Sequence, residues 1–306
     1  MIEMKVPIRS YCRLGIVHSM AYPEAAQASS SFIQTLHHLM EDPWFDIIEL
    51  GQLPFPEQEA VVVESCAQAH VGCTYSAHGR LFRTGLNINS LDEAERLQAI
   101  RELEAGVDEA YRLGALDFQF LSRGWSSDAI DEHLAALVDS TVTICRYVAE
   151  KGQMPVVLEI FDNDIDKCSL IGPAPLAARY AQAVCREVDN FGLMVDCSHI
   201  PMLRETLDEA IDPIRKYIRH AHMGNTLISD PSNPCYGDLH PRFGYPGSEN
   251  NTEYLAAYLS KLLEIGYLNP VSRPILSFEV KPRPDENPEL VIAGCKRILD
   301  EAWLMV

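Results

Sequence analysis

Four short apolar segments in the second half of the chain each end in a side chain that can bind a metal ion. These end residues are Glu159, Asp196, His222 and Glu279, and loop-forming residues follow each of them. Three carboxylates supply hard oxygen donors and one imidazole supplies a nitrogen, a set that suits Mn2+, Mg2+ or Co2+ better than a metal selected by thiolates. We predict that these four residues bind one divalent metal ion, with Mn2+ preferred and Mg2+ or Co2+ as alternatives.

The segments that carry these residues belong to an alternation of short apolar runs with longer amphipathic ones. Strands that alternate with helices predict a parallel sheet with crossover connections. Eight such strands favour closure into a (β/α)8 TIM barrel, an α/β fold, over an open sheet. The predicted strands are 14–18, 46–50, 72–77, 117–121, 156–160, 193–196, 218–222 and 275–280.

A barrel would bring the four ligand candidates together, because catalytic residues of TIM barrels come from the carboxyl ends of several strands. No linker or Gly-x-Gly-x-x-Gly motif interrupts the pattern, so we expect one domain over residues 1–306. The loop after strand seven, 223–250, is long and rich in Gly, Pro, Asn and Asp. Loops of this length in compact domains usually have a function, and we predict that this one is a lid.

The N-terminus of three predicted helices can be placed from the sequence. Ser90-Leu-Asp-Glu93 has the pattern of a capping box before an amphipathic stretch. A second helix is expected from about residue 128. A third should begin at Asn287-Pro288, because proline is tolerated in the first turn of a helix.

Composition restricts the class of protein. The 306 residues include 25 basic and 44 acidic ones, a net charge of −19, which argues against a general nucleic-acid binder. No run of about 18 apolar residues and no signal-peptide pattern is present, so we expect neither a membrane span nor export. The nine cysteines are scattered without a Cys-x-x-Cys pair, which fits a reducing cytoplasm.

Two further motifs make the pattern more specific. Asp196-Cys-Ser-His199 places an imidazole three positions after the predicted aspartate ligand, and His220-Ala-His222 ends the seventh strand. With the four ligand candidates, these motifs resemble the xylose-isomerase-like superfamily of TIM barrels, and within it the tagatose and psicose 3-epimerases. The resemblance covers residues 115–300 well and the first 110 residues only by element order.

The resemblance implies a metal-dependent sugar isomerase or epimerase. Glu159 and Glu279 would act as acid and base on opposite faces of a small sugar or keto-sugar, with proton abstraction next to a carbonyl and an enediolate intermediate. Barrels of this superfamily often form homo-oligomers, and some need a partner subunit. The chain departs from the epimerases where it has Ile165 in place of a glutamate and Ile228 in place of an arginine. Asp164 and Asp166 are candidates to replace the glutamate, and no obvious residue replaces the arginine.

Other polar residues are predicted to contact the substrate. His199 would touch a substrate oxygen, His220 would lie deeper in the barrel, and Lys281 should point to the same side as Glu279. The remaining candidates lie on loops at the barrel mouth and are His78, Trp125, Asp238, His240 and Arg242.

Three alternatives remain open. A lyase or dehydratase would use the same proton abstraction but expel a leaving group from a keto-sugar or a 3-keto-(C-)glycoside. An abasic-site nuclease of the endonuclease IV type would bind three zinc ions, and Asp238 and His240 fit part of its pattern, but its fourth-strand histidine has no counterpart. A barrel that binds a sugar without turnover would not need two opposed glutamates.

Overall fold

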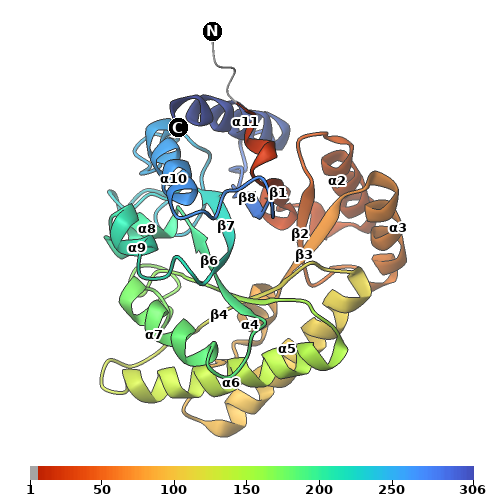
Figure 1. Ribbon diagram of the computed structural model, residues 1–306. Coiled ribbons are helices and arrows are strands. Elements are labelled where there is room, and N and C mark those ends of the chain that lie inside the picture. The colour runs from red at the N-terminus through yellow and green to blue at the C-terminus, as the bar shows by residue number, and fades with distance from the viewer. Residues whose placement is uncertain (1–5) are drawn as a thin grey trace.

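Eight parallel strands pair in chain order and β8 pairs back with β1 in the computed structural model, which describes residues 6–306. The prediction of a (β/α)8 barrel is confirmed (Figure 1). The largest boundary differences are at β6, which starts at Phe191 instead of 193, and at β7, which ends at Gly224 instead of 222. The strands are β1 (Arg13–Val17), β2 (Ile47–Gly51), β3 (Gly72–Ser76), β4 (Phe118–Leu121), β5 (Val156–Glu159), β6 (Phe191–Asp196), β7 (Ile218–Gly224) and β8 (Ile275–Glu279).

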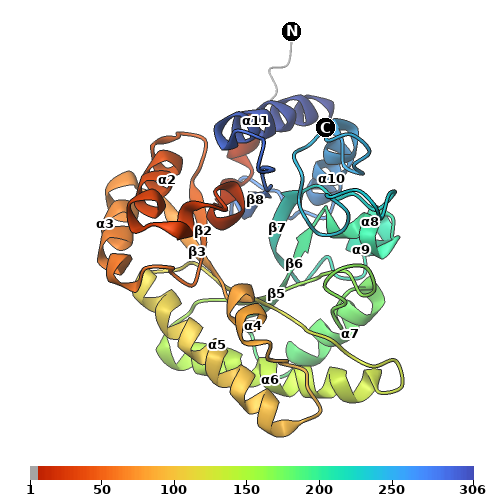
Figure 2. The ribbon, with the colours of Figure 1, turned by 180° about the vertical axis from the view of Figure 1, so that it is seen from behind.

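Helices surround the barrel on all sides (Figures 1 and 2). The longer ones are α2 (Ser29–Glu41), α3 (Glu59–Ala69), α5 (Glu93–Leu113), α6 (Ile130–Lys151), α7 (Ala174–Val184), α10 (Thr252–Glu264) and α11 (Pro288–Met305). Short helices directly follow three strands, namely α1 (His18–Ala21), α4 (His78–Thr84) and α8 (His199–Leu203), and α9 (Leu207–Ile211) follows α8 and packs against α7 and α10. The 3-10 turns are η1 (Ile8–Ser10), η2 (Ala25–Gln27) and η3 (Pro56–Gln58).

The helix starts agree only in part with the predicted signals. Helix α5 is capped by Asp92, whose side chain accepts the N–H of Ala94, and not by Ser90. Ser90 Oγ accepts the backbone N–H of Asp92 and so shapes the turn before the cap. Helix α11 begins at Pro288 with Asn287 as its cap, as predicted. A complete capping box forms instead at Thr206, at the start of α9.

The barrel interior is polar in its middle and upper parts. Because side chains alternate along a strand, one residue in two points inward. In β7 the inward residues include His220 and His222, whose rings are hydrogen-bonded to Glu49 of β2. The apolar core lies mostly outside the barrel, between the strands and the helices. The inward-facing positions of the strands can therefore carry charged side chains that hydrogen-bond one another.

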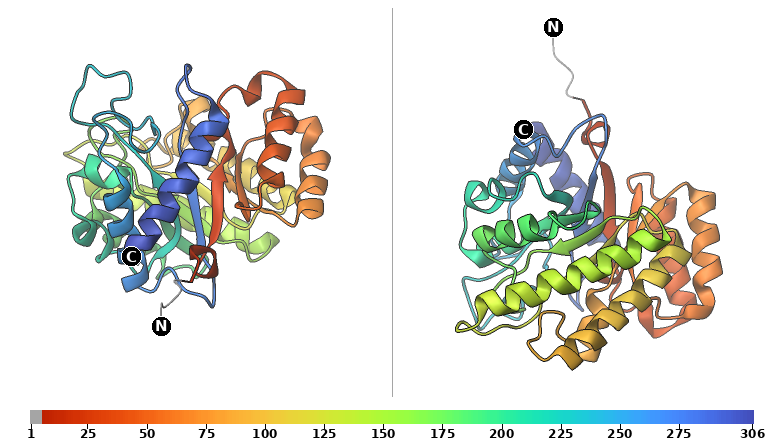
Figure 3. Two further views of the ribbon diagram at one scale, coloured as in Figure 1. Left: turned by 90° about the horizontal axis from the view of Figure 1, so that it is seen from above. Right: turned by 60° about the horizontal axis from the view of Figure 1, so that its bottom comes forward.

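The loop between β7 and α10 folds back over the carboxyl ends of the strands (Figure 3, left). Its two ends are fastened by buried asparagines. Asn225 Oδ1 accepts the N–H of Asn250, and Asn250 Nδ2 donates to the carbonyls of Cys197 and Gly224. These bonds hold Asp238 and His240, in the second half of the loop, at the mouth of the barrel.

In the part of the chain that the structure describes, no helix combines the length and apolar character that a membrane crossing requires.

Candidate active site

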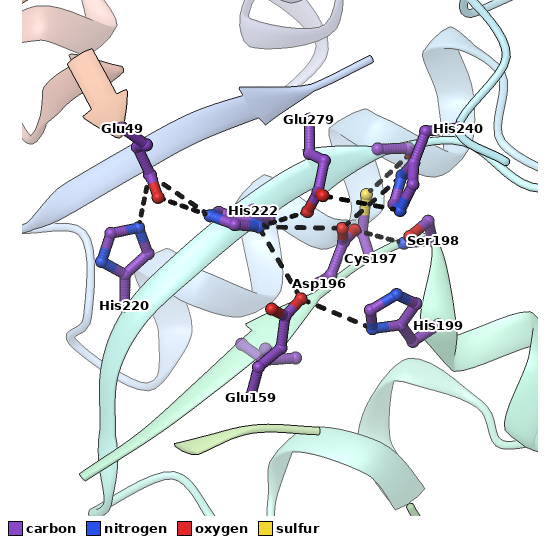
Figure 4. Close-up of polar contacts among 12 residues, drawn as sticks. Glu49, Glu159, Asp196, Cys197, Ser198, His199, His220, His222, His240 and Glu279 are labelled. Atoms are coloured by element: carbon purple, nitrogen blue, oxygen red, sulfur yellow. Dashed lines mark hydrogen bonds and ion pairs between the residues drawn. The ribbon is translucent and has the colours of Figure 1, made fainter. Parts of the chain in front are cut away.

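The four predicted ligands meet at the carboxyl end of the barrel. Their ligand atoms, from Glu159, Asp196, His222 and Glu279, all lie within 4.8 Å of one another. His222 Nδ1 is 2.7 Å from Glu279 Oε2, 3.8 Å from Glu159 Oε1 and 3.9 Å from Asp196 Oδ2. Figure 4 shows the four side chains converging from the ends of β5, β6, β7 and β8.

Two oxygens of this centre are buried without a hydrogen-bond partner. They are Oε1 of Glu159 and Oδ2 of Asp196, on side chains that are each 1% exposed. The other oxygen of Asp196, Oδ1, accepts the N–H of Ser198 at 2.7 Å, which fixes the carboxylate. Unpartnered buried carboxylate oxygens are costly unless a cation or proton satisfies them. The donor set and its orphaned oxygens therefore fit a bound divalent cation.

The His222 ring is oriented by a carboxylate that the sequence did not single out. Nε2 of His222 lies 3.2 Å from both carboxylate oxygens of Glu49, a residue of β2 that is 1% exposed. A metal-binding histidine is commonly held in this way through its other nitrogen, which fixes the tautomer and turns the lone pair toward the metal. Because Nε2 is taken by Glu49, Nδ1 is the nitrogen of His222 that faces the other three predicted ligands.

Glu49 belongs to a buried network in the middle of the barrel. Its Oε1 is 2.8 Å from His220 Nε2, and His220 Nδ1 is 2.8 Å from Asp117 Oδ2. Gln119 Nε2 donates to Glu49 and to Asp117. Burial alone would raise the pKa of Glu49, but the charges and hydrogen bonds of His220 and His222 hold it well below its ordinary value. His220 thus lies below the centre, as predicted.

The two glutamates of the centre differ in protonation. Burial, with the nearby charge of Glu279, raises the pKa of the Glu159 carboxyl to about 8. Burial would also raise the pKa of Glu279, but the charge of His240 and the hydrogen bond from His222 lower it to about 2. Burial would lower the pKa of His222, yet Glu49 and Glu279 raise it well above its ordinary value. A divalent cation at this centre would therefore have to displace protons from Glu159 and His222.

A second polar cluster lies beside the centre and is organised by Asp238. Asp238 Oδ1 is 2.9 Å from His199 Nε2 and 2.8 Å from His240 Nε2, and its Oδ2 is 2.9 Å from Lys167 Nζ. Burial would raise the pKa of Asp238, but the two histidines hold it well below its ordinary value. Asp196, His199 and His240 also form a group whose ligand atoms are close enough to share a metal ion. Here, however, Lys167 already places a positive charge on Asp238.

The loop after β5 presents Lys167 to this cluster. Asp162, which is fully buried, accepts the backbone N–H groups of residues 165, 166, 167 and 168. A carboxylate that accepts several successive N–H groups fixes the backbone of a loop. Neither Asp164 nor Asp166 lies at the wall of the cavity: Asp164 pairs with Arg204, and Asp166 accepts the N–H of Asp238. Lys167 is therefore the charged residue of this loop that faces the cavity.

A cavity of about 550 Å3 opens above the centre, and its size suits a small organic ligand. Of the four predicted ligands, Glu279 lines it, whereas Glu159, Asp196 and His222 are buried and do not line it. His78, Asp238, His240 and Lys281, all predicted at the substrate, line the same cavity. His78 Nε2 lies 3.4 Å from Glu159 Oε2 and has no hydrogen-bond partner.

Three other predicted contacts are placed differently. His199 is 1% exposed, and both of its ring nitrogens are taken, one by the carbonyl of Ile160 and one by Asp238. Arg242 pairs with Glu286, and Trp125 packs against the apolar core. None of the three lines the cavity. His199 therefore positions Asp238, and a direct contact of any of the three with a substrate stays a prediction.

The nuclease alternative gains no support from this geometry. It requires a histidine on the fourth strand near His78, but β4 turns Gln119 toward His220. Across residues 6–306, no group of three or more close metal-ligand atoms includes His78.

A family comparison places this site in context. The sequence profile of the xylose isomerase-like TIM barrel matches residues 43–300. The chain belongs to that family. The match spans all four predicted ligands and confirms the resemblance that the sequence motifs indicated.

Solved structures with the same fold include sugar epimerases. A D-tagatose 3-epimerase-like protein is 17% identical, with 95% of this chain and 98% of that chain covered and a TM-score of 0.70. The 3-keto-D-glucoside 4-epimerase YcjR from E. coli is 15% identical over 94% of this chain and 98% of that chain, with a TM-score of 0.67. The IolI protein with a bound zinc atom is 17% identical over 96% and 99%, with a TM-score of 0.68. Such low identities show the fold, and no curated protein matches the chain in sequence.

Two residues of the candidate site, Glu49 and Lys167, were not predicted from the sequence. Glu49 interrupts the apolar run Ile47-Ile48-Glu49-Leu50, and a lone carboxylate inside a predicted strand was a usable signal. Lys167 ends an Asp-rich loop and resembles any solvated lysine. Its role depends on the turn that Asp162 holds, which the sequence pattern does not reveal.

Proposed function

We propose that this protein is a divalent-metal-dependent sugar isomerase or epimerase that abstracts a proton next to a carbonyl. The observation that carries the proposal is the convergence of Glu159, Asp196, His222 and Glu279 within 4.8 Å, below a cavity of about 550 Å3. A divalent cation at this centre would polarise a carbonyl and a neighbouring hydroxyl and so acidify the carbon between them. Mn2+ is the preferred metal.

Glu279 is the base in this proposal. Its carboxylate lines the cavity, and a pKa of about 2 keeps it ionised at neutral pH. It takes the proton from the carbon next to the carbonyl, which leaves an enediolate. Lys281, which also lines the cavity, contributes positive charge near the developing oxyanion.

Glu159 is the acid. Without a metal, a pKa of about 8 keeps its carboxyl protonated at neutral pH. Because a bound cation would displace that proton, Glu159 must take up another proton before it can act as the acid. Glu159 is buried and does not line the cavity, so the unpartnered Nε2 of His78, 3.4 Å away, gives its proton a path to the substrate. Return of the proton on the face opposite Glu279 produces an epimer, and return to the neighbouring carbon produces the isomeric sugar.

The substrate class that we propose is a small sugar or keto-sugar. The fold is shared with a D-tagatose 3-epimerase-like protein and with a 3-keto-D-glucoside 4-epimerase, which supports this choice. Elimination from a keto-sugar is a second candidate, since the ammonium groups of Lys167 and Lys281 line the same cavity as Glu279 and could protonate a leaving group.

Metal content and hydrogen exchange test the proposal together. We would measure metal by inductively coupled plasma mass spectrometry, then incubate the Mn2+-loaded protein with ketoses and 3-keto-glucosides in D2O. We expect about one metal ion per chain and uptake of deuterium at the carbon next to the carbonyl. Glu279→Gln should lower the exchange rate by roughly 10²–10⁴-fold while the protein still folds.

The matched control is Glu286→Gln, a substitution in the loop that follows β8, at a side chain that pairs with Arg242 and does not line the cavity. It should leave exchange unchanged. Three zinc ions per chain, or no exchange with any of these sugars, would overturn the proposal.

A further inference from the structure

The cavity above the candidate metal centre has two chemically different halves. Lys167, Asp238, His240, Glu279 and Lys281 line the half formed by the ends of β5, β7 and β8. The other half, which we call the apolar annex, is formed after β1, β2 and β3, and its lining includes Met20, Tyr22, Ala26, Phe32, Leu53 and Phe82. The two halves are parts of one continuous space of about 550 Å3.

This space is larger than a monosaccharide needs. A hexose has about twelve non-hydrogen atoms, roughly half as many as the drug-sized ligands that pockets of about 300–1,000 Å3 hold. A hexose seated at Glu279 would therefore leave the annex to another part of the same molecule.

The polar groups of the annex are largely occupied by the protein itself. His18 Nε2 is 2.9 Å from Thr35 Oγ1, and the Tyr22 hydroxyl donates to Glu289 at 2.5 Å. Arg83 donates to Gln52 and to Glu102. A second sugar would need hydrogen-bond partners for its hydroxyls, and buried polar groups without partners are unfavourable. An apolar group has no such requirement.

The walls of the annex are aromatic and firmly held. The Phe32 ring packs edge-on against His18 at 5.2 Å and lies 6.2 Å from Phe55. The Arg123 guanidinium lies 4.8 Å from the centroid of Phe82, whose residue is 38% exposed. Exposed apolar side chains that line a concave site commonly mark a binding surface. Fixed rings of this kind suit a flat, apolar ligand group.

We propose that the substrate is a keto-sugar glycoside with an aromatic aglycone, whose sugar binds over Glu279 and whose aglycone fills the annex. This inference rests on the proposed function, because it assumes that the polar half holds the reacting sugar. It assigns the annex a role in substrate selection, separate from the chemistry at the four ligands.

The test compares the 3-keto derivatives of phenyl and methyl β-D-glucopyranoside and of cellobiose, bound to the Mn2+-loaded protein and measured by isothermal titration calorimetry. We expect the phenyl compound to bind at least about tenfold more tightly than the methyl compound. Ala26→Trp, which fills the annex, should abolish this difference while methyl-glycoside affinity is kept. Gln27→Trp is the matched control, since Gln27 is the exposed neighbour and does not line the cavity.

A second variant, Phe82→Ala, tests the same inference if the Ala26→Trp protein does not fold. Phe82→Ala removes a partly exposed ring and should weaken phenyl-glycoside binding severalfold without affecting the methyl compound. Equal binding of the phenyl and methyl compounds, or a preference for 3-keto-cellobiose, would overturn the inference. Self-association that Ala26→Trp abolishes, together with no phenyl preference, would show instead that a second copy of the chain covers the annex.

Deuterium exchange on the methyl compound separates the two proposals. Exchange without a phenyl preference contradicts only the role of the annex. A phenyl preference without exchange on any compound contradicts the proposed reaction.

Discussion

At the scale of single residues, the site depends on side chains that hold others in place. His222 can offer Nδ1 to a metal because Glu49 lies 3.2 Å from its Nε2. Asp238 is held in turn by His199, His240 and Lys167. Residues that orient ligands affect metal binding nearly as strongly as the ligands themselves.

Glu49→Gln should weaken metal binding. The amide has no negative charge to stabilise the His222 N–H and must also pair with His220, so the ring loses part of its orientation. We expect the Kd for Mn2+ to rise by roughly 10–100-fold, measured by competition with a chelating dye. Glu57→Gln, at an exposed position after the same strand, should not change the Kd. An unchanged Kd in Glu49→Gln would contradict the role that we assign to Glu49.

Metal affinity should increase with pH. With a pKa of about 8, Glu159 carries a proton at pH 6 and pH 7 that the metal must displace, and His222 carries another. Each displaced proton makes the Kd about tenfold smaller per unit of rising pH. We expect the Kd to fall by about 10–100-fold per unit between pH 6 and pH 8, and less steeply above pH 8. The Glu159→Gln variant should bind metal more weakly, and its Kd should change with pH by about tenfold less per unit because one proton fewer is displaced. A Kd of the unmodified protein that does not change with pH would contradict the protonation of both Glu159 and His222.

At the scale of elements, the barrel closes where β1 meets β8. Gly15 of β1 pairs with Ser277 of β8, and a Cβ added at Gly15 would lie 2.2 Å from Ser277 Oγ. The Ser277 hydroxyl has no hydrogen-bond partner, so its presence is not required by a polar contact. The absence of a side chain at Gly15 therefore lets the last strand approach the first.

Gly15→Ala should destabilise the barrel at this seam. The added methyl group must displace Ser277, and overpacking of a core typically costs about 1–3 kcal/mol in the free energy of unfolding. Urea denaturation followed by circular dichroism would measure the loss. Ser277→Ala should recover most of it in the double variant and cost little by itself. Full stability of Gly15→Ala would show that the seam is looser than these distances indicate.

The β7–α10 loop is the second element that decides the site. His240 has a φ of +48°, an unusual conformation for a residue other than glycine, and its carbonyl accepts the N–H of Lys281 at 2.7 Å. This bond ties the loop to the segment after β8, which carries Glu279. The predicted lid is thus fastened at Asn225, at Asn250 and at His240, and its movement as a lid stays a prediction.

At the scale of the whole molecule, the candidate metal centre links the second half of the barrel. The four predicted ligands come from β5, β6, β7 and β8, and Glu49 adds β2 through His222. Buried oxygens of Glu159 and Asp196 have no hydrogen-bond partner, so the folded protein should gain stability from a bound metal that satisfies them.

Metal removal should therefore lower Tm. At a Mn2+ concentration 100 times the Kd, binding adds about 2.7 kcal/mol to the free energy of unfolding, which corresponds to roughly 3–8 °C in a chain of this size. Differential scanning calorimetry with and without a chelator would measure the shift. His222→Ala should abolish it, and His38→Ala, at an exposed position, should keep it. A Tm that is the same in both conditions would mean that no metal binds the folded chain in preference to the unfolded one.

The sequence by itself determined the barrel and its four ligand candidates. Strand periodicity is a local property, and Glu159 directly ends the apolar run Val156-Val157-Leu158, as Asp196 ends Leu193-Met194-Val195. The family match and the closed eight-stranded sheet confirm the fold, and the positions of Glu159, Asp196, His222 and Glu279 agree with the predicted centre.

Only the tertiary structure decided which other residues reach the site. Glu49 contacts His222 across 173 positions of the chain, and Lys167 reaches Asp238 because Asp162 holds its loop. Arg242 and Trp125 lie at suitable points of the sequence, yet Arg242 pairs with Glu286, Trp125 packs against the apolar core, and neither lines the cavity. The apolar annex likewise combines loops after β1, β2 and β3. Such contacts depend on loop conformation and on packing between distant strands, neither of which local periodicity encodes.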